Sequence, residues 1–295
     1  MTRTSPSTDR AISMLLFLAA EPLRSFKLAD ITRSVGISHA SAHAVLASLE
    51  QEGFVRRNDR DRTFSLGPTL IGLDVAARRG LPVVDVARTH MQRLSDELVL
   101  ECHAGVQVAD QILVVARTGA RSPFGVGVEV GQRLPLVPPL GTPYVAWSGP
   151  QAIEAYLRRA APDCGADALE RYRQAIDMVR QRGYAVALDA ATRQRFGELA
   201  AELARNPGAD LRPLEVAAQD LLGVDYLLLE LEGAASYDVT GISAPVFGPD
   251  GSVVLVVGLV GFGRGLPAPQ IPEVAKRVVA TTAAITRDLG RSSRP

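Results

Sequence analysis

A glycine-serine turn between two helical segments constrains the fold of this chain more than any other feature. Residues 27–35 carry apolar side chains on one helical face, and Gly36-Ile37-Ser38 then forms a tight turn. Ser38 is a residue type that caps helices, so a second helix is expected from His39 to Glu52. Ahead of this pair, Asp9–Ala20 has the spacing of another helix. The pattern predicts a small module of three helices.

Two short strands follow the last of these helices. Phe54–Arg57 and Thr63–Leu66 flank the polar tip Asn58–Arg62, which is typical of a β-hairpin. Three helices and a hairpin predict a winged helix-turn-helix over residues 1–66. Helices in this order also occur in modules that only pack against protein, so the hairpin carries the argument for DNA. Its arginines suit a backbone that bears a negative charge every few ångströms.

The rest of the chain reads as a linker helix over residues 67–80 and a second domain over residues 81–295. Expected strands are 99–108, 112–117, 125–130, 184–188, 241–247 and 252–261; expected helices are 83–98, 142–147, 152–159, 167–182 and 271–289. Strand runs with helices at both ends favour an α+β domain with a mostly antiparallel sheet, not a βαβ series.

Bulk composition narrows the class of protein. The 295 residues include 32 basic and 32 acidic side chains, and residues 1–66 are only mildly basic, with nine Lys/Arg against seven Asp/Glu. We expect no membrane span, because no apolar run reaches the roughly 18 residues required. The first residues lack the apolar core of a signal peptide. Cys102 and Cys164 provide no disulfide framework. A cytoplasmic, reduced protein is expected.

Four further motifs resemble the IclR family of transcriptional regulators. They are FSLGPTLIGL (64–73), VGQRLPL (130–136), RQRGYAV (180–186) and GISAPVFGPDGSVVLVVGLVG (241–261). Their order and spacing agree with the family along most of the chain. The resemblance implies a winged helix joined to a GAF-like effector domain. It also implies a homodimer or dimer of dimers, a double-stranded DNA operator and a small-molecule effector, with no cofactor and no membrane partner.

The candidate DNA-binding residues depart from the family at one point. The family usually has an arginine in the middle of the recognition helix, where this chain has Ala44. Polar side chains and free N–H groups at the front of a helix can still contact bases or phosphates. The candidates are Arg33, Ser38, His39, Ser41, His43, Arg56, Arg57 and Arg62, with Arg60 also available in the wing.

The resemblance also places an effector pocket in the second domain. Its candidate residues are Val126, Leu134, Leu140, Gly141, Tyr144, Asp189, Val239, Gly241, Gly258 and Val260. Relatives that bind small hydrophilic acids carry polar side chains where this chain has Gly241, Gly258 and Val260. Apolar walls would strip a carboxylate of its hydration, so we expect a larger, mostly apolar effector. Tyr144, Asp189 or backbone amides would orient its polar end. The alternative is a pocket filled by the protein's own side chains.

An insertion over about residues 190–236 is a second departure from the family. Two of its segments have helical character, RFGELAAELARNPG (195–208) and LEVAAQDLLG (214–223), and YLLLELE (226–232) has strand character. The insertion could be a lid over the pocket, a dimer contact or a decoration without a role.

Enzyme and metal-binding alternatives find little support. Gly261-x-Gly263-x-Gly265 follows an apolar strand, but prolines come next instead of the helix, strand and acid of a dinucleotide site, which also disfavours a methyltransferase. Cys102 and His103 are neighbours in an expected strand, so they face opposite sides and cannot share an ion. No nucleophile elbow is present.

One alternative stays open. The chain could be a GAF-like ligand- or partner-binding protein whose winged helix serves dimerisation rather than DNA binding. A DNA affinity that falls steeply with salt would distinguish a regulator from such a protein.

Overall fold

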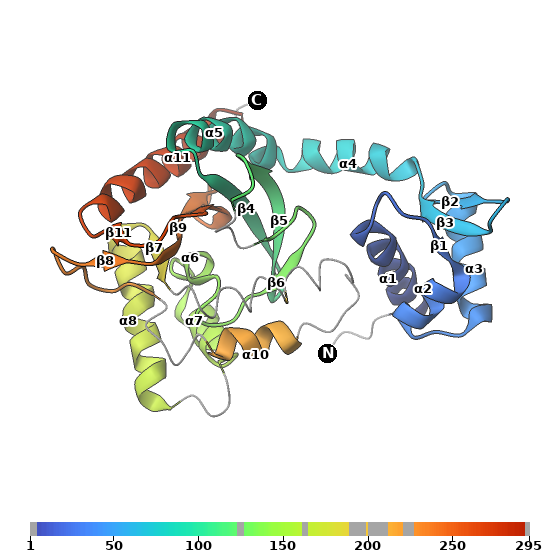
Figure 1. Cartoon of the computed structure of the whole chain (residues 1–295), viewed down its shortest axis with the longest axis horizontal. Coiled ribbons are helices and arrows are strands. Elements are labelled where there is room, and N and C mark those ends of the chain that lie inside the picture. Colours follow the sequence, from blue (N-terminus) through green and yellow to red (C-terminus); the bar gives the residue numbers. More distant parts are fainter. Residues whose placement is uncertain are drawn as a thin grey trace. The chain divides into compact units, whose positions relative to one another are not determined.

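The computed structural model describes residues 5–122, 127–160, 165–188, 199, 212–220 and 227–292 (Figure 1). The described chain forms two compact units, one on residues up to Leu81 and one on residues from Pro82 onward. The first unit has one hydrophobic core and the second has two. None of the described helices is long and apolar enough to cross a membrane.

The first unit contains helices α1 (Pro6–Ala20), α2 (Leu28–Val35), α3 (His39–Gln51) and α4 (Thr69–Gly80) and strands β1 (Phe26–Lys27), β2 (Val55–Asn58) and β3 (Thr63–Leu66). The strands form an antiparallel sheet in the order β1-β3-β2. Its core joins Met14, Leu18, Ile31, Leu46 and Phe64. The three helices and the hairpin predicted from the sequence are confirmed.

Strand β1 is the element of this unit that the sequence did not predict. It is two residues long, and Phe26 lies opposite Phe64 of β3. A strand of two residues is defined only by its pairing, here with β3, which lies far along the chain. The helix α2 therefore begins at Leu28, and the carboxylate of Asp30 accepts a hydrogen bond from the backbone N–H of Lys27 (3.2 Å) just ahead of it.

The second unit is built on a six-stranded antiparallel sheet in the order β6-β5-β4-β10-β9-β7. Its strands are β4 (Glu101–Val108), β5 (Gln111–Thr118), β6 (Arg133–Pro135), β7 (Ala185–Leu188), β9 (Val239–Phe247) and β10 (Val253–Val260). A separate pair joins β8 (Ser236–Tyr237) to β11 (Leu266–Pro267). The predicted α+β class is confirmed.

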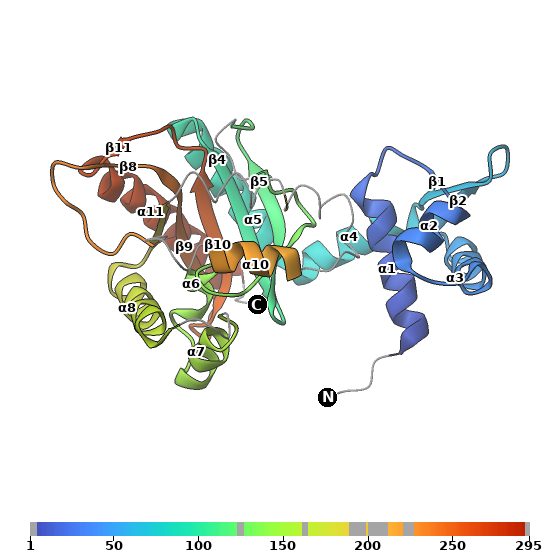
Figure 2. The same cartoon turned by 60° about the horizontal axis from the view of Figure 1, so that its bottom comes forward.

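Helices cover both faces of this sheet (Figures 1 and 2). On one face α5 (Pro82–Leu98) and α11 (Gln270–Ser292) pack side by side against Leu255, Val257 and Leu259. On the other, α6 (Thr142–Val145), α7 (Pro150–Leu157) and α8 (Ala166–Arg182) share a second core with Val256. The alternation of β10 side chains assigns them to the two cores. α10 (Arg212–Asp220) contacts β6.

The expected strand over residues 125–130 is wrong for the part of it that the structure describes. Residues 127–130 are not in a strand, and the strand that pairs with β5 on this side is β6, which begins at Arg133. Gly127 and Gly131 have positive φ angles (65° and 90°), and the N–H of Gln132 donates to the carbonyl of Glu129 (3.1 Å). This stretch is a turn that delivers the chain to β6.

The insertion is described only in part. Its α10 confirms helical character in the second predicted segment, and Leu227 makes an isolated bridge to Ala187. The segment 195–208 lies outside the described residues except for position 199.

Candidate nucleic-acid interface and ligand site

The recognition helix α3 presents small side chains and two histidines outward. Its buried face is Ala42 and Leu46, which pack on the core of the first unit. Ala40, His43, Ala44 and Ala47 are exposed around the rest of the helix, and His39 is exposed in its first turn. Because alanine is short, DNA could approach this exposed surface closely, with the two imidazoles as its polar groups.

Ser38 and Ser41 stabilise the start of this helix. The Ser38 hydroxyl accepts from the backbone N–H of Ser41 (3.3 Å) and donates to the Ser41 hydroxyl (3.1 Å). Ser38 is therefore the N-cap that its residue type predicted. Both hydroxyls have a structural role that the sequence-based candidate set did not separate from DNA contact.

The arginines at the base of the wing contact other side chains or backbone, and those at its tip are exposed. Arg56 donates from Nε to the carbonyl of Leu66 (3.3 Å). The guanidinium of Arg57 lies 5.9 Å from the ring centroid of Phe64 and 3.9 Å from the Asp59 carboxylate. Arg62 is exposed at the tip with a φ of 55°, and Arg33, on α2, is exposed 3.7 Å from Asp30. None of these ion pairs is buried, so DNA phosphates could replace the acidic partners.

The start of α4 is tied to the end of α3. The N–H of Gly67 donates to the carbonyl of Phe54 (2.7 Å), and the N–H of Thr69 donates to that of Gly53 (3.2 Å). The Thr69 hydroxyl donates to the carbonyl of Glu52 (2.8 Å). Gly53 has a φ of 71°, which a glycine adopts without strain. The beginning of α4 is thus fixed to the recognition helix.

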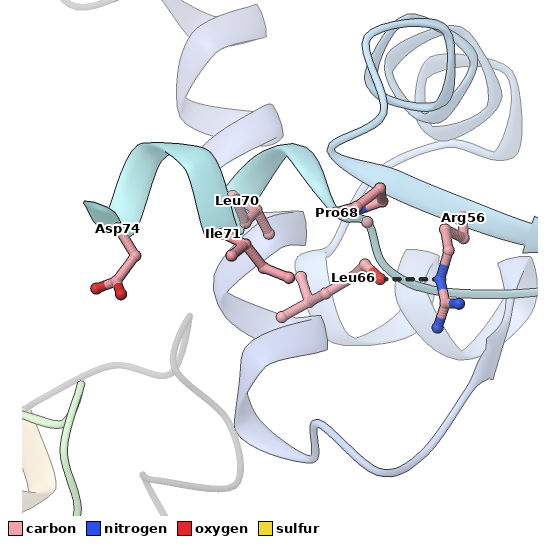
Figure 3. Close-up of a pocket in the computed structure, with 7 residues that line it drawn as sticks. Arg56, Leu66, Pro68, Leu70, Ile71 and Asp74 are labelled. Atoms are coloured by element: carbon pink, nitrogen blue, oxygen red, sulfur yellow. Dashed lines mark hydrogen bonds between the residues drawn. The ribbon is translucent and has the colours of Figure 1, made fainter. Parts of the chain in front are cut away.

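A groove of about 530 Å³ runs along α4 (Figure 3). It is lined by Arg56, Leu66, Gly67, Pro68, Leu70, Ile71 and Asp74. None of the α4 residues, all of which the structure describes, is buried, and Ile71 is 69% exposed. Helix α4 therefore has apolar side chains but no buried face, so it lacks the tertiary packing that normally stabilises a helix.

In the second unit, Gly241 of β9 and Gly258 of β10 leave part of one sheet face without side chains. This is the face that α6 partly covers. In register, Gly258 of β10 lies between His103 of β4 and Ser243 of β9, and Gly241 lies opposite Val260. We call Gly241 and Gly258 the glycine strip. Among described residues, a Cβ on either glycine would meet within 4 Å only atoms of β9 and β10. No described helix or loop comes within this distance.

Covered positions border the strip. Gly105 lies on β4, two residues after His103. A Cβ at Gly105 would lie 2.5 Å from the Tyr144 hydroxyl and 2.8 Å from Cγ2 of Ile112. On the other side, Ser122 packs against Gly261 and donates to its carbonyl (3.2 Å). The bare strip is therefore a bounded area between α6 and the segment that contains Ser122.

A buried polar cluster flanks the strip. Oε1 of Glu101 accepts from Nε2 of His103 (2.9 Å) and from Nε of Arg117 (2.6 Å), and Oε2 accepts from the N–H of Ser122 (3.2 Å). Glu101 is 4% exposed and His103 is 9% exposed. Nδ1 of His103 is buried and has no hydrogen-bond partner among the described residues.

The cluster keeps Glu101 ionised. Burial alone would raise the pKa of this carboxyl, but the hydrogen bonds from His103, Arg117 and the Ser122 amide outweigh burial and lower the pKa from 4.5 to about 2. The carboxylate thus accepts at every pH in the physiological range, which requires that Nε2 of His103 carries a hydrogen.

The predicted effector-binding residues are brought together in part. Gly241, Gly258 and Val260 lie together on the face that α6 covers, and Tyr144 of α6 and Gly141, just before it, lie near Ile112 on the same face. Leu134 is not part of this group, because it lies on the edge strand β6, three strands from β10. The carbonyl of Leu140 accepts from the Tyr156 hydroxyl (2.9 Å). Burial raises the pKa of the Tyr144 hydroxyl, so it is a neutral donor. Val239 packs instead in the core shared with α11, because the pairing of β7 with β9 shifts register beside it. Val126 and Asp189 lie outside the described residues.

The polar cluster was missed by the sequence reasoning, although a signal was present. Residues two apart in a strand face the same side of the sheet, so the spacing Glu101-x-His103 predicts that these two side chains can form a hydrogen bond. Arg117 could not be added without the β4–β5 register. The adjacent Cys102 points into the opposite core, and burial raises the pKa of its thiol to about 12.

Two family patterns match the chain. The IclR helix-turn-helix domain matches residues 7–59, and the C-terminal domain of the bacterial transcriptional regulator IclR matches residues 75–193. The glycerol operon regulatory protein of Streptomyces coelicolor is 29% identical over 233 residues, which cover 76% of this chain and 86% of that protein. The regulator XynR of Escherichia coli is 22% identical over 185 residues, 61% of this chain and 73% of that protein.

Solved structures share the fold. An IclR transcriptional regulator from Alicyclobacillus acidocaldarius superposes with a TM-score of 0.68 at 19% identity, covering 98% of this chain and 100% of that one. An IclR homologue from Microbacterium hydrocarbonoxydans, solved with 4-hydroxybenzoate, has a TM-score of 0.62 at 18% identity, covering 97% of this chain and 100% of that one.

Proposed function

Because this chain belongs to the IclR family of transcriptional regulators, we propose that α3 and the β2–β3 wing bind an operator and that a small molecule on the sheet of the second unit modulates this binding. The protein is a DNA-binding transcriptional regulator with a helix-turn-helix domain. The observation that carries the docking proposal is the exposed histidine and alanine face of α3, with basic side chains in the wing of the same unit.

The proposed docking places α3 in the major groove. His39 and His43 would donate to or accept from base edges, and Ala40, Ala44 and Ala47 would contact thymine methyl groups. Ser38 and Ser41 would approach a phosphate at the helix start, where free N–H groups favour an anion. Arg33, Arg56, Arg57 and Arg62 would contact the phosphate backbone. Without an arginine at position 44, the histidines supply the base contacts of α3.

The effector site is proposed on the glycine strip. Gly241 and Gly258 provide a floor, and Val260 lies beside them in the sheet. Leu134 lies three strands from β10, on the edge strand β6, so it would not contact a small molecule on the strip; Leu140 stays a candidate for a wall. Tyr144 would bound one end, and Val126 and Asp189 stay candidates for the remaining walls. A mostly apolar small molecule matches this composition, because its burial needs few compensating hydrogen bonds.

A homodimer is the proposed assembly. The exposed apolar side chains of α4 and the groove beside them suit the α4 of a second copy, whose own apolar side chains would fill the groove. Residues 67–80 would then act as a linker helix that joins two reading heads. Ligand binding in the second unit would bias their spacing, a coupling typically worth about 1–3 kcal/mol. Since operator binding requires access to the chromosome, we propose a cytoplasmic location, and we propose no catalytic role.

Selection of genomic fragments by the purified full-length protein tests the function. We expect a discrete inverted repeat, bound with an affinity that falls steeply as salt rises. His43→Ala should weaken this site about ten-fold or more, and Arg62→Ala should reduce the salt slope by about one. The matched control is Arg264→Ala, an exposed arginine of the second unit, which should change neither.

The opposite result would identify the alternative. A folded protein that enriches no site at low salt is a ligand- or partner-binding protein whose winged helix serves dimerisation. The exposed alanine at position 44 is the observation that favours this second reading.

A further inference from the structure

A buried histidine nitrogen without a partner lies beside the glycine strip. Nδ1 of His103 is inaccessible to solvent, and leaving a buried polar atom without a hydrogen bond destabilises the folded state. Its lateral neighbours in the sheet are Arg117 and Gly258. Arg117 is engaged with Glu101, and Gly258 has no side chain. The sheet itself therefore supplies nothing for this nitrogen to bond.

Glu101 decides which ring nitrogen of His103 holds a hydrogen in the neutral form. Because the carboxylate stays ionised and accepts from Nε2, the hydrogen of the neutral imidazole is on Nε2. In this neutral form Nδ1 carries a lone pair and acts as an acceptor. Arg117 balances the charge of Glu101, so with a neutral imidazole the cluster has no net charge that would call for an anionic ligand.

We propose that Nδ1 of His103 accepts a hydrogen bond from a hydroxyl group of the effector, whose apolar body lies over Gly258 and Gly241. This assignment rests on the proposed effector site and names its ligand class, a small hydroxylated molecule with an apolar body. Strand spacing places His103 about 5 Å from Gly258 and about 10 Å from Ser243, a span suited to a single ring. Glu101 positions the imidazole and does not touch the ligand.

Three para-substituted toluenes that differ in their polar group test the ligand class by calorimetry on the full chain. 4-Methylphenol carries a hydroxyl, 4-methylanisole has an ether oxygen without a hydrogen, and 4-methylbenzoate carries a carboxylate. We expect 4-methylphenol to bind and the other two to bind about ten-fold more weakly or worse. Equal binding of phenol and ether, tighter binding of the carboxylate, or no binding of the phenol overturns the assignment.

Two variants locate the contact. His103→Gln keeps an N–H at the position of Nε2 for Glu101 and removes Nδ1, so folding should persist while 4-methylphenol binding falls about ten-fold. Gly258→Val fills the strip, where a Cβ meets only ordinary contacts at 3.5 Å and 3.9 Å, and should abolish binding. The control is His90→Gln on α5, whose Nε2 also bonds a carboxylate, that of Asp288 (2.9 Å). It should bind like the wild type.

The variants separate this inference from the effector site on which it rests. Loss of binding in Gly258→Val with unchanged binding in His103→Gln would retain the site and refute the role of His103. Unchanged binding in both variants would place the ligand elsewhere and refute the proposed site itself. Operator affinity, measured in parallel without any probe, reports on the DNA-binding function independently of both.

Discussion

At the scale of single residues, Ala44 is the clearest difference between α3 and the recognition helix usual in the family. Ala44 is exposed on the outward face of α3 between His43 and Ala47. We expect Ala44→Arg to raise affinity for duplex DNA at low salt and to steepen the salt slope by about one, because an added arginine displaces about one more counterion. Fluorescence anisotropy over a salt series measures this slope.

A charge added elsewhere provides the comparison. Ala234→Arg places the same side chain on an exposed site of the second unit and should leave the slope unchanged. If both variants steepen the slope equally, or neither does, α3 does not face the phosphates as proposed.

Glu101 carries the second residue-scale prediction, which concerns acid stability. Its pKa is lowered from 4.5 to about 2 in the folded state, so the folded protein gains roughly 3 kcal/mol at neutral pH. That contribution is complete above about pH 5 and is lost as the pH falls toward 2. We expect Glu101→Gln to cost about 2–4 kcal/mol at pH 7, because Arg117 keeps its charge without a partner. The difference from wild type should shrink at pH 3.

Urea unfolding followed by the fluorescence of Trp147, the single tryptophan and part of the second unit, measures the effect. Glu97→Gln is the control, because Glu97 and Arg277 form an exposed ion pair worth less than about 1 kcal/mol. A constant difference between wild type and Glu101→Gln from pH 7 to pH 3 would contradict the ionised state of Glu101.

These residues also show how far a site can be foreseen from sequence. The exposed histidines of α3 and the arginines of the wing follow from helical and hairpin periodicity, which is local. The Glu101, His103 and Arg117 cluster requires the register of two strands, and the glycine strip requires that of β9 with β10. Register depends on long-range pairing, so the polar half of the candidate ligand site could not be placed in advance.

At the scale of elements, the tie between α3 and α4 has a testable consequence. Thr69→Val removes the hydroxyl that bonds the carbonyl of Glu52, and Thr69→Ser retains it. One such bond is worth about 1 kcal/mol, so amide hydrogen exchange in α4 should speed up about five-fold in Thr69→Val. Thr69→Ser should match the wild type. Equal exchange in all three proteins would mean that the backbone bonds of Gly67 and Thr69 suffice.

Elements with strong local signals were predictable, and those held by distant partners were not. α3 has its serine cap and α8 ends at Gly183, which has a φ of 84°. By contrast, β1, β8 and β11 are two residues long, and each exists only through its pairing. The displaced strand β6 belongs to the same class, because glycines at 127 and 131 turn the chain where alternation alone favoured a strand.

At the scale of the whole molecule, operator affinity should depend on assembly through α4. Two reading heads joined in one dimer engage an inverted repeat with an avidity that can exceed either head alone by about 10²–10⁴. Ile71→Asn replaces an apolar side chain that is 69% exposed, so the fold of a single chain should be unaffected. Each dimer carries the change twice. If each substituted side chain loses about 1.5–2 kcal/mol of burial energy, the dimerisation constant should fall about 10²-fold or more.

Analytical ultracentrifugation and operator binding, measured over the same protein concentrations, test this dependence together. We expect Ile71→Asn to lower affinity for the inverted repeat while leaving affinity for a single half-site unchanged, because the substitution carries no charge and lies outside α3. Val99→Asn is the matched control, since Val99 is 88% exposed with a φ of 53°, a conformation that asparagine tolerates. An Ile71→Asn protein that still dimerises would exclude α4 as the interface, and one that loses half-site affinity would show that α4 supports the reading head rather than the assembly.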